Sequence, residues 1–413
     1  MPINNQQWKI VFLSSLGGAL EFYDFVIFAV FAMVIGETFF PASSPLLSML
    51  GAFAAFAVGY LARPFGGMIF SLFGDRHTRK RVFVLSISIL ALATLLMGLL
   101  PGFATLGVTA SILFIFLRLA QGIAIGGEIP GAVTFICEHI PKHPGLVCGI
   151  IFLFINLGIL LADIVHALLA KFDPSIAWRI AFILGGVLAI LSYFLRKKLE
   201  ESELFLQEKK RHNLPIAALF KHHSRNAISG VFIAGSQAAI VSIFYLYITA
   251  FMQLQHYNNM VIAYITIINL SIFSIFCIFG GALSDRWGQK MVIMICSVFL
   301  IPAGIYFYHS IVIHGNVMLS YMLLSILSGG IVGTVSAYLT KLFPTDVRYS
   351  GIAFCYNVGF AIFGGLTPAL ATYLIHHSND AKAPSYLMSV VFIIAVISLF
   401  ISKTYTKDLA RRR

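Results

Sequence analysis

The sequence GGALEFYDFVIF, residues 17–28, lies inside the first long apolar run of the chain and carries two carboxylates, Glu21 and Asp24. A charge at the centre of a lipid-spanning helix costs roughly 2.5–3.5 kcal/mol on insertion scales, so paired carboxylates in such a run indicate a function. The two acids are three positions apart and share one helical face, which leaves the remaining perimeter apolar toward lipid. We predict that this face lines a watery cavity and handles protons. The alternative, for either acid alone, is a structural ion pair with a buried arginine.

The composition predicts a helical membrane protein with many spans. Of the 413 residues, 59% are hydrophobic and 11% are charged, and the mean hydropathy is +0.92. Repeated apolar runs of about 20 residues have the length of membrane-spanning helices. The runs predict twelve spans, at 8–34, 47–73, 82–101, 106–131, 145–170, 177–196, 226–252, 259–284, 290–308, 316–341, 348–374 and 384–403.

The basic charge of the chain indicates its topology. A net charge of +12 would suit a nucleic-acid partner, but most of the 28 lysines and arginines fall on one side when the loops are placed alternately on two sides. The positive-inside rule then places those loops and both termini in the cytoplasm. We therefore expect a lipid bilayer around the chain and no nucleic-acid partner.

An internal repeat divides the chain into two halves. SLFGDRHTRK at 71–80 follows the second predicted span, and GALSDRWGQK at 281–290 follows the eighth. Parallel repeats are a known organisation of membrane transporters. We predict a six-helix bundle over 1–200, a cytoplasmic linker over 201–225 and a second six-helix bundle over 226–413.

The second of these segments matches the loop signature G-x-L-x-D-R-x-G-x-K of the major facilitator superfamily. More specifically, the chain resembles the metabolite:proton symporter family, which includes proline/betaine, citrate, α-ketoglutarate and shikimate carriers. The matching segments are EFYDF at 21–25, LARPFGGMIFSLFGDR at 61–76, RLAQGIAIGGE at 118–128, WRIAF at 178–182, LRKKLEESELF at 195–205 and FPTDVRYSG at 343–351. The resemblance implies an all-α membrane protein of twelve transmembrane helices in two pseudo-symmetric six-helix bundles. One departure is the loop at 138–149, which has His143 and Gly145 where the family usually has arginines.

Away from the ends of the predicted spans, the acidic and basic residues Glu21, Asp24, Arg63, Arg118, Glu128 and Asp163 all lie in the first half of the chain. Positions 226–284, 291–340 and 349–379 contain no Asp, Glu, Lys or Arg, so side-chain proton coupling must use the first half. We expect Glu21 and Asp24 to carry protons, because changing hydration and a nearby cation shift the pKa of a carboxyl group in opposite directions. Arg118 is their expected partner, which the resemblance supports; it acts either as a switch for the acids or as an anchor for a substrate carboxylate.

Further candidates follow from polar residues within the predicted spans. Arg63 precedes Pro64 and either contacts substrate or bonds the kinked backbone. Asp163 either contributes to selectivity or simply pairs with His166. Most polar residues in such helices only bond a neighbouring helix, and that interpretation stays open for each candidate. The candidate substrate contacts are Arg63, Gln121, Asn156, Asp163, Gln237, Tyr245 and Asn357, and the candidate gate residues are Asp75, Arg76, Glu128, Asp285 and Arg286.

Together these observations predict a secondary active transporter of the bacterial inner membrane. We expect a monomer that carries a small carboxylate-bearing metabolite with protons by alternating access. The substrate is either a zwitterion such as proline or betaine or a di- or tricarboxylate. Sodium stays open as the coupling ion, because a carboxylate with backbone carbonyls can hold either ion. The alternatives are a drug or metabolite:proton antiporter of the same fold and, more remotely, a non-transporting sensor. No enzyme motif, cofactor site or metal-spaced cluster is present in the sequence, and the scattered cysteines do not predict one, so we expect neither an enzyme nor a cofactor.

Overall fold

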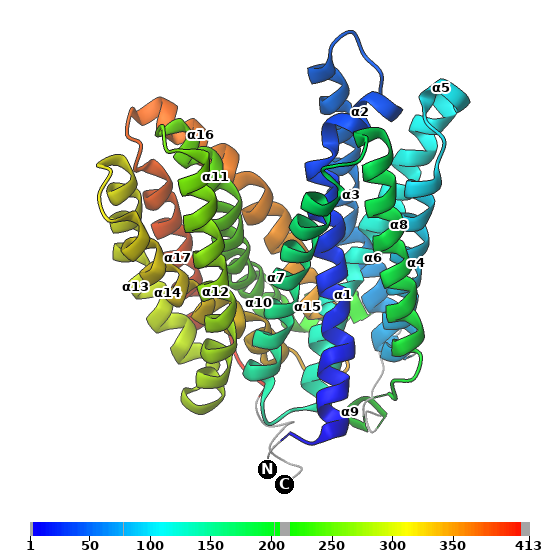
Figure 1. The fold of residues 1–413 in the computed structure, drawn as a ribbon. Coiled ribbons are helices and arrows are strands. Elements are labelled where there is room, and N and C mark those ends of the chain that lie inside the picture. The colour runs from blue at the N-terminus through cyan, green and yellow to red at the C-terminus, as the bar shows by residue number, and fades with distance from the viewer. Residues whose placement is uncertain (1–2, 77, 202, 207–214, 406–413) are drawn as a thin grey trace. The chain divides into compact units, whose positions relative to one another are not determined.

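The computed structural model describes residues 3–76, 78–201, 203–206 and 215–405 (Figure 1). Over these residues, twelve helices are long and apolar enough to cross a membrane, so the predicted number of spans is confirmed. The membrane-length helices of the first half are α1 (Asn5–Val30), α3 (Pro45–Arg76), α4 (Arg79–Leu99), α6 (Val108–His139), α7 (Pro144–Leu169) and α8 (Pro174–Arg196). The short helices α2 (Ala32–Phe39), α5 (Phe103–Leu106) and α9 (Glu203–Leu206) lie between or after them.

Two spans of the second half contain a π-helical turn. Helix α10 (Pro215–Ile240) continues through η1 (Val241–Leu246) into α11 (Tyr247–Leu254), and α15 (Arg348–Gly359) continues through η2 (Phe360–Gly364) into α16 (Gly365–Ser378). The other spans are α12 (Asn259–Trp287), α13 (Gln289–Val312), α14 (Val317–Leu342) and α17 (Ala383–Ile401). A π-turn frees backbone groups, which must be bonded again inside a membrane. Here the hydroxyl of Ser242 donates a hydrogen bond of 2.5 Å to the carbonyl of Gly364.

The chain divides into two compact units, Met1–Phe135 with Phe154–Asn213 and Ile136–Leu153 with Leu214–Arg413. The second unit thus includes the end of α6 and the start of α7. Of the predicted linker at 201–225, residues 202 and 207–214 lie outside the described residues. The described part contains α9 and the first turns of α10, which begins at Pro215 and has non-helical backbone angles at His223.

Within each unit, the helices pack through apolar side chains and close backbone approaches. Helix α4 packs on α8 in the first unit, and α12 packs on α14 in the second (Figure 1). Helices α3 and α6 approach most closely at Gly59 and Gly122, where a Cβ added to Gly122 would lie 1.9 Å from the carbonyl oxygen of Gly59. Arg63 is one turn from Gly59, and Arg118 is one turn from Gly122. Small residues at this crossing therefore bring both arginines close to the facing helix.

Candidate functional site

Glu21 and Asp24 on α1 are both buried, with 2% and 4% of their surface exposed. Each carboxylate pairs with a different arginine. Glu21 Oε1 lies 2.9 Å from Nη2 of Arg63 on α3, and Asp24 Oδ2 lies 2.9 Å from Nη1 of Arg118 on α6. Helix α1 therefore turns both acids into the first unit and away from lipid. The two buried ion pairs balance in charge, as buried charges must.

The Asp24–Arg118 pair belongs to a larger hydrogen-bonded network, which we call the Asp24 network: Asp24, Thr94, Arg118 and Gln121. The side-chain amide of Gln121 donates to Asp24 Oδ1 at 3.1 Å and to the hydroxyl of Thr94 at 2.6 Å, while Arg118 donates to Gln121 Oε1 at 2.6 Å. Thr94 itself donates to Asp24 Oδ1 at 3.3 Å. The sequence interpretation missed Thr94, because a single threonine in the apolar run of α4 carries no signal of its own.

Aromatic rings lie under both arginines. The guanidinium carbon of Arg118 lies 4.2 Å from the ring centroid of Phe28 and 4.8 Å from that of Phe56. The guanidinium carbon of Arg63 lies 5.0 Å from the ring of Tyr60. Such contacts stabilise a cation by about 0.5–2 kcal/mol without fixing a hydrogen-bond direction. They leave the donor groups of each arginine directed by its carboxylate partner.

Three of the neighbouring rings are half-buried and contact one another, and we call them the aromatic wall: Phe25, Phe56 and Tyr60. The centroids of Phe25 and Phe56 are 5.0 Å apart, and those of Phe56 and Tyr60 are 6.1 Å apart. Phe28, by contrast, is fully buried. The aromatic wall thus offers partly open π-faces beside two arginine–carboxylate pairs, an arrangement that can hold an onium group next to a carboxylate site.

The remaining first-unit candidates lie on α7. Asn156 is buried at 8% exposure. Asp163 is exposed and lies roughly 9 Å along α7 from its end at Leu169. Because an exposed carboxylate inside a span faces water and not lipid, Asp163 marks a polar surface of this unit. The ring of His166 packs edge-on against Phe31, with centroids 5.4 Å apart.

The polar candidates of the second unit differ in how they are bonded. The hydroxyl of Tyr245 lies 3.1 Å from the hydroxyl of Ser325, and the side-chain amide of Asn357 donates to the carbonyl of Ala353 in its own helix at 2.9 Å. Gln237 is fully buried, and its amide nitrogen lies 3.5 Å from the carbonyl of Val332. Its Oε1 accepts no hydrogen bond from any residue within the described ranges. Of these side chains, Gln237 offers a buried acceptor for a further ligand or water.

Glu128 forms an ion pair with Arg196, and the guanidinium of Arg196 also bonds to backbone carbonyls. Its Oε1 lies 2.6 Å from Nη1 of Arg196, and its Oε2 accepts a 2.7 Å hydrogen bond from Ser86. The same guanidinium donates to the carbonyls of Leu13 and Ser14 on α1, at 3.1 and 3.0 Å. This cluster ties together α1, α4, α6 and α8.

The repeated aspartates make different contacts in the two units. Asp75 lies 3.2 Å from Arg79 at the start of α4, and Arg76 is exposed. Asp285 on α12 accepts hydrogen bonds from the backbone amides of Gly145 at 2.7 Å and Leu146 at 2.9 Å. These amides belong to the first turn of α7, where unpaired N–H groups and the helix dipole favour an anion.

The loop at 138–149 therefore contacts α12 through its backbone, without the arginines that the family usually has there. Arg286, next to Asp285, is exposed. A further pair was missed by the sequence interpretation: Nη1 of Arg348 lies 2.7 Å from Oε1 of Glu138, and both side chains are buried. Helix α6 runs to His139, beyond its predicted end at 131, so Glu138 is part of the helix.

Comparisons with known proteins agree with this architecture. The family model described as Major Facilitator Superfamily matches residues 15–354 and 278–412. The proline/betaine transporter of Salmonella typhimurium is 28% identical over 94% of this chain and 82% of its own length. The inner membrane metabolite transport protein YhjE of Escherichia coli K12 is 30% identical over 99% of this chain and 97% of its own length.

Solved structures share the fold at low sequence identity. The proton:xylose symporter XylE, bound to 6-bromo-6-deoxy-D-glucose, superposes with a TM-score of 0.80 at 15% identity, covering 100% of both chains. The human organic anion transporter MFSD10 gives a TM-score of 0.69 at 14% identity, covering 96% of this chain and 100% of its own. The chain is a multi-pass membrane transporter and not an enzyme, and it belongs to the Major Facilitator Superfamily.

Proposed function

We propose that the chain is a proton-coupled symporter that imports a small zwitterion with a carboxylate group. In this proposal a monomer works by alternating access in a bacterial inner membrane, with both termini in the cytoplasm, and the proton is the coupling ion with no further cofactor. The observation that carries the proposal is the buried Asp24–Arg118 pair at 2.9 Å, held by hydrogen-bonding side chains and aromatic rings.

The coupling step is an exchange of anions at Arg118. While Asp24 is ionised, its carboxylate is paired with the guanidinium of Arg118 and blocks other anions from it. Protonation of Asp24 neutralises that partner, and Arg118 then attracts the carboxylate of a substrate, which a guanidinium can bind with two parallel hydrogen bonds. Proton loss to the cytoplasm restores the original pair and expels the substrate. Proton and substrate therefore promote each other's binding, as linkage requires.

Glu21 and Arg63 form a neighbouring pair that can follow the same cycle. Among the described residues, Asp24 contacts the charged side chain of Arg118, and Glu21 lies on the same helix. We assign the primary role to Asp24 because Gln121 and Thr94 can keep its protonated form hydrogen-bonded. A carboxyl group that retains partners in both protonation states can gain and lose a proton inside a membrane protein at a smaller cost.

The aromatic wall supports a zwitterion over a di- or tricarboxylate. The half-buried faces of Phe25, Phe56 and Tyr60 can receive an ammonium group while an arginine holds the carboxylate. A second carboxylate on the substrate would instead meet these apolar faces. Proline/betaine transporters among the relatives support the same substrate class.

Uptake into proteoliposomes tests the proposal. Purified protein is reconstituted, and accumulation of radiolabelled proline, glycine betaine and citrate is measured under an inward proton gradient, under an inward sodium gradient and with neither. We expect the zwitterions to accumulate above equilibrium only under the proton gradient. Accumulation driven by sodium, net export driven by protons, or preference for citrate would each contradict the proposal.

A substitution in the aromatic wall tests the substrate class separately. Phe25 contacts the other rings of the wall, and no contact with an arginine is recorded for it within the described residues. Loss of one cation–π contact, worth about 0.5–2 kcal/mol, should raise the KM for glycine betaine about 2- to 30-fold in Phe25→Leu. Phe25→Tyr keeps the π-face and should stay near the wild-type value. Equal KM values for the two variants would remove the wall from the substrate site.

A further inference from the structure

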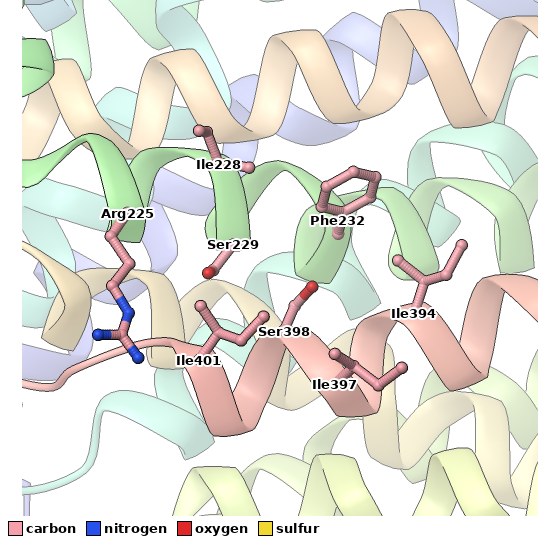
Figure 2. Close-up of a pocket in the computed structure, with 8 residues that line it drawn as sticks. All are labelled: Arg225, Ile228, Ser229, Phe232, Ile394, Ile397, Ser398 and Ile401. Atoms are coloured by element: carbon pink, nitrogen blue, oxygen red, sulfur yellow. The ribbon is translucent and has the colours of Figure 1, made fainter.

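A groove opens between α10 and α17 in the second unit, with a volume of about 310 Å³ (Figure 2). Ile228 and Phe232 on α10 form one wall, and Ile397 and Ile401 on α17 form the other. Ile228, Ile397 and Ile401 are 58%, 51% and 42% exposed. In a membrane span, exposed branched side chains meet lipid acyl chains, so this groove opens toward lipid.

Small residues make the groove hollow. Ser229 on α10 and Ser398 on α17 lie between the larger side chains, and each is only 3% exposed (Figure 2). The wall from Arg225 to Phe232 covers eight residues of helix, whose seven rises of about 1.5 Å span roughly 10 Å. This length fits within one leaflet, since the hydrocarbon core of a bilayer is about 30 Å thick. The groove therefore suits the upper part of one acyl chain.

A cation stands at one end of the groove. Arg225 is exposed and lines the cavity beside Ile401 (Figure 2). Its side chain makes no hydrogen bond or ion pair with the described residues. Its surroundings add positive charge: Lys221 is four residues earlier, before the non-helical backbone at His223, and Lys403 follows α17, where its backbone amide donates to the side chain of Asn226 at 2.9 Å. Positions 215–284 and 383–405 contain no acidic residue.

We propose that this groove binds an anionic phospholipid, with one acyl chain between α10 and α17 and the phosphate on Arg225. A guanidinium forms paired hydrogen bonds to phosphate oxygens, and the basic neighbours favour a net negative headgroup. The groove end with Arg225 faces the cytoplasmic leaflet in the orientation proposed above, where anionic lipids are concentrated. An apolar groove that ends at a cation can bind both the acyl chain and the headgroup of a lipid. A soluble anion would bind the cation alone and leave the apolar groove unfilled.

Native mass spectrometry of the full chain in detergent tests this site. Delipidated protein is titrated with phosphatidylglycerol, with phosphatidylcholine and with glycerol 3-phosphate. We expect phosphatidylglycerol to bind more tightly than phosphatidylcholine, and glycerol 3-phosphate to leave the groove empty. Equal binding of the two lipids, or saturation by glycerol 3-phosphate, would overturn the proposal.

Variants locate the binding at the groove. Arg225→Gln should weaken phosphatidylglycerol binding about fivefold, the effect of one basic residue at a membrane surface. Arg286→Gln is the matched control: it removes an exposed guanidinium from α12, outside the groove, and should change binding less than twofold. Ser229→Leu and Ser398→Leu fill the groove from opposite helices and should each abolish the tight binding while leaving Arg225 intact; having both guards against one that fails to fold. Wild-type binding by Arg225→Gln, or by a folded filled-groove variant, would overturn the assignment.

Discussion

Replacing Asp24 by asparagine should separate transport from proton coupling. The substitution keeps the shape of the side chain and its reach to Gln121 and Thr94, but it removes the charge that lies 2.9 Å from Arg118. In the proposed cycle Arg118 is then permanently open to a substrate carboxylate. The variant should bind and exchange substrate, and it should no longer use a proton gradient.

The size of the effect follows from the energy of one proton. Movement of one charge through about 100 mV releases about 2.3 kcal/mol. Because 1.36 kcal/mol corresponds to a factor of ten, coupling to one proton supports roughly 50-fold accumulation of a solute without net charge. A carrier without ion coupling only equilibrates such a solute. The plateau ratio of inside to outside substrate should therefore fall from roughly 50 to about 1 in Asp24→Asn.

The assay measures two quantities in the same proteoliposomes, the plateau ratio under an imposed membrane potential and the rate of counterflow exchange. Exchange shows that the variant is folded, which matters because a buried guanidinium without its partner destabilises a protein by about 3–5 kcal/mol. Thr94→Val is the matched control: it removes a hydrogen bond to Asp24 but keeps the ion pair, so its plateau should stay near the wild-type ratio even if its rate falls. A wild-type plateau together with normal exchange in Asp24→Asn would refute the role of this acid in coupling.

Three substitutions test the packing around the other charges. Gly17→Ala would place a Cβ 1.8 Å from Oε1 of Glu128 and should lower the Tm by breaking the ion-pair cluster there, which thermal unfolding in detergent measures. Gly145→Ala would place a Cβ 2.2 Å from the carbonyl oxygen of Gly281 and should push the start of α7 away from α12. Thiol labelling of the buried Cys148, in the first turns of α7, should then rise. Unchanged labelling would count against a tight contact. Arg348→Gln removes the guanidinium that pairs with the buried carboxylate of Glu138 and should cost about 3–5 kcal/mol of stability, visible as a lower urea midpoint.

The sequence predicts the spans well because hydropathy acts locally. The twelve apolar runs coincide with the twelve membrane-length helices, although several helix ends differ from the predicted ones. Helix α6 extends past its predicted end because Glu138 pairs with Arg348, which is 210 positions away. A window of neighbouring residues cannot reveal that pairing. The carboxylate looks like a loop residue in the sequence and is a buried helical residue in the structure.

Partners within the candidate site depend on helix packing that the sequence does not encode locally. The spacing of Glu21 and Asp24 places both on one face of α1, but it does not say which acid meets which arginine. The close crossing at Gly59 and Gly122 sets that choice, because it fixes the heights of the arginines on α3 and α6. The aromatic wall likewise depends on helix packing, since Phe25 comes from α1 whereas Phe56 and Tyr60 come from α3.

Each buried arginine has contacts besides its carboxylate partner, and these contacts distinguish an ion pair that can change partners from one that is structural. Arg196 donates to two backbone carbonyls as well as to Glu128, so a change of partner would leave rigid main-chain acceptors unpaired in a low-dielectric interior. Arg118 has no such tether among the contacts that the structure describes. Beyond Asp24 it contacts a side-chain amide on its own helix, at Gln121, and aromatic faces that hold a cation without a fixed direction. A guanidinium held in this way can exchange one carboxylate for another at low cost. The buried pair on α1 and α6 therefore fits ion coupling, whereas the pair on α6 and α8 fixes the helices around it.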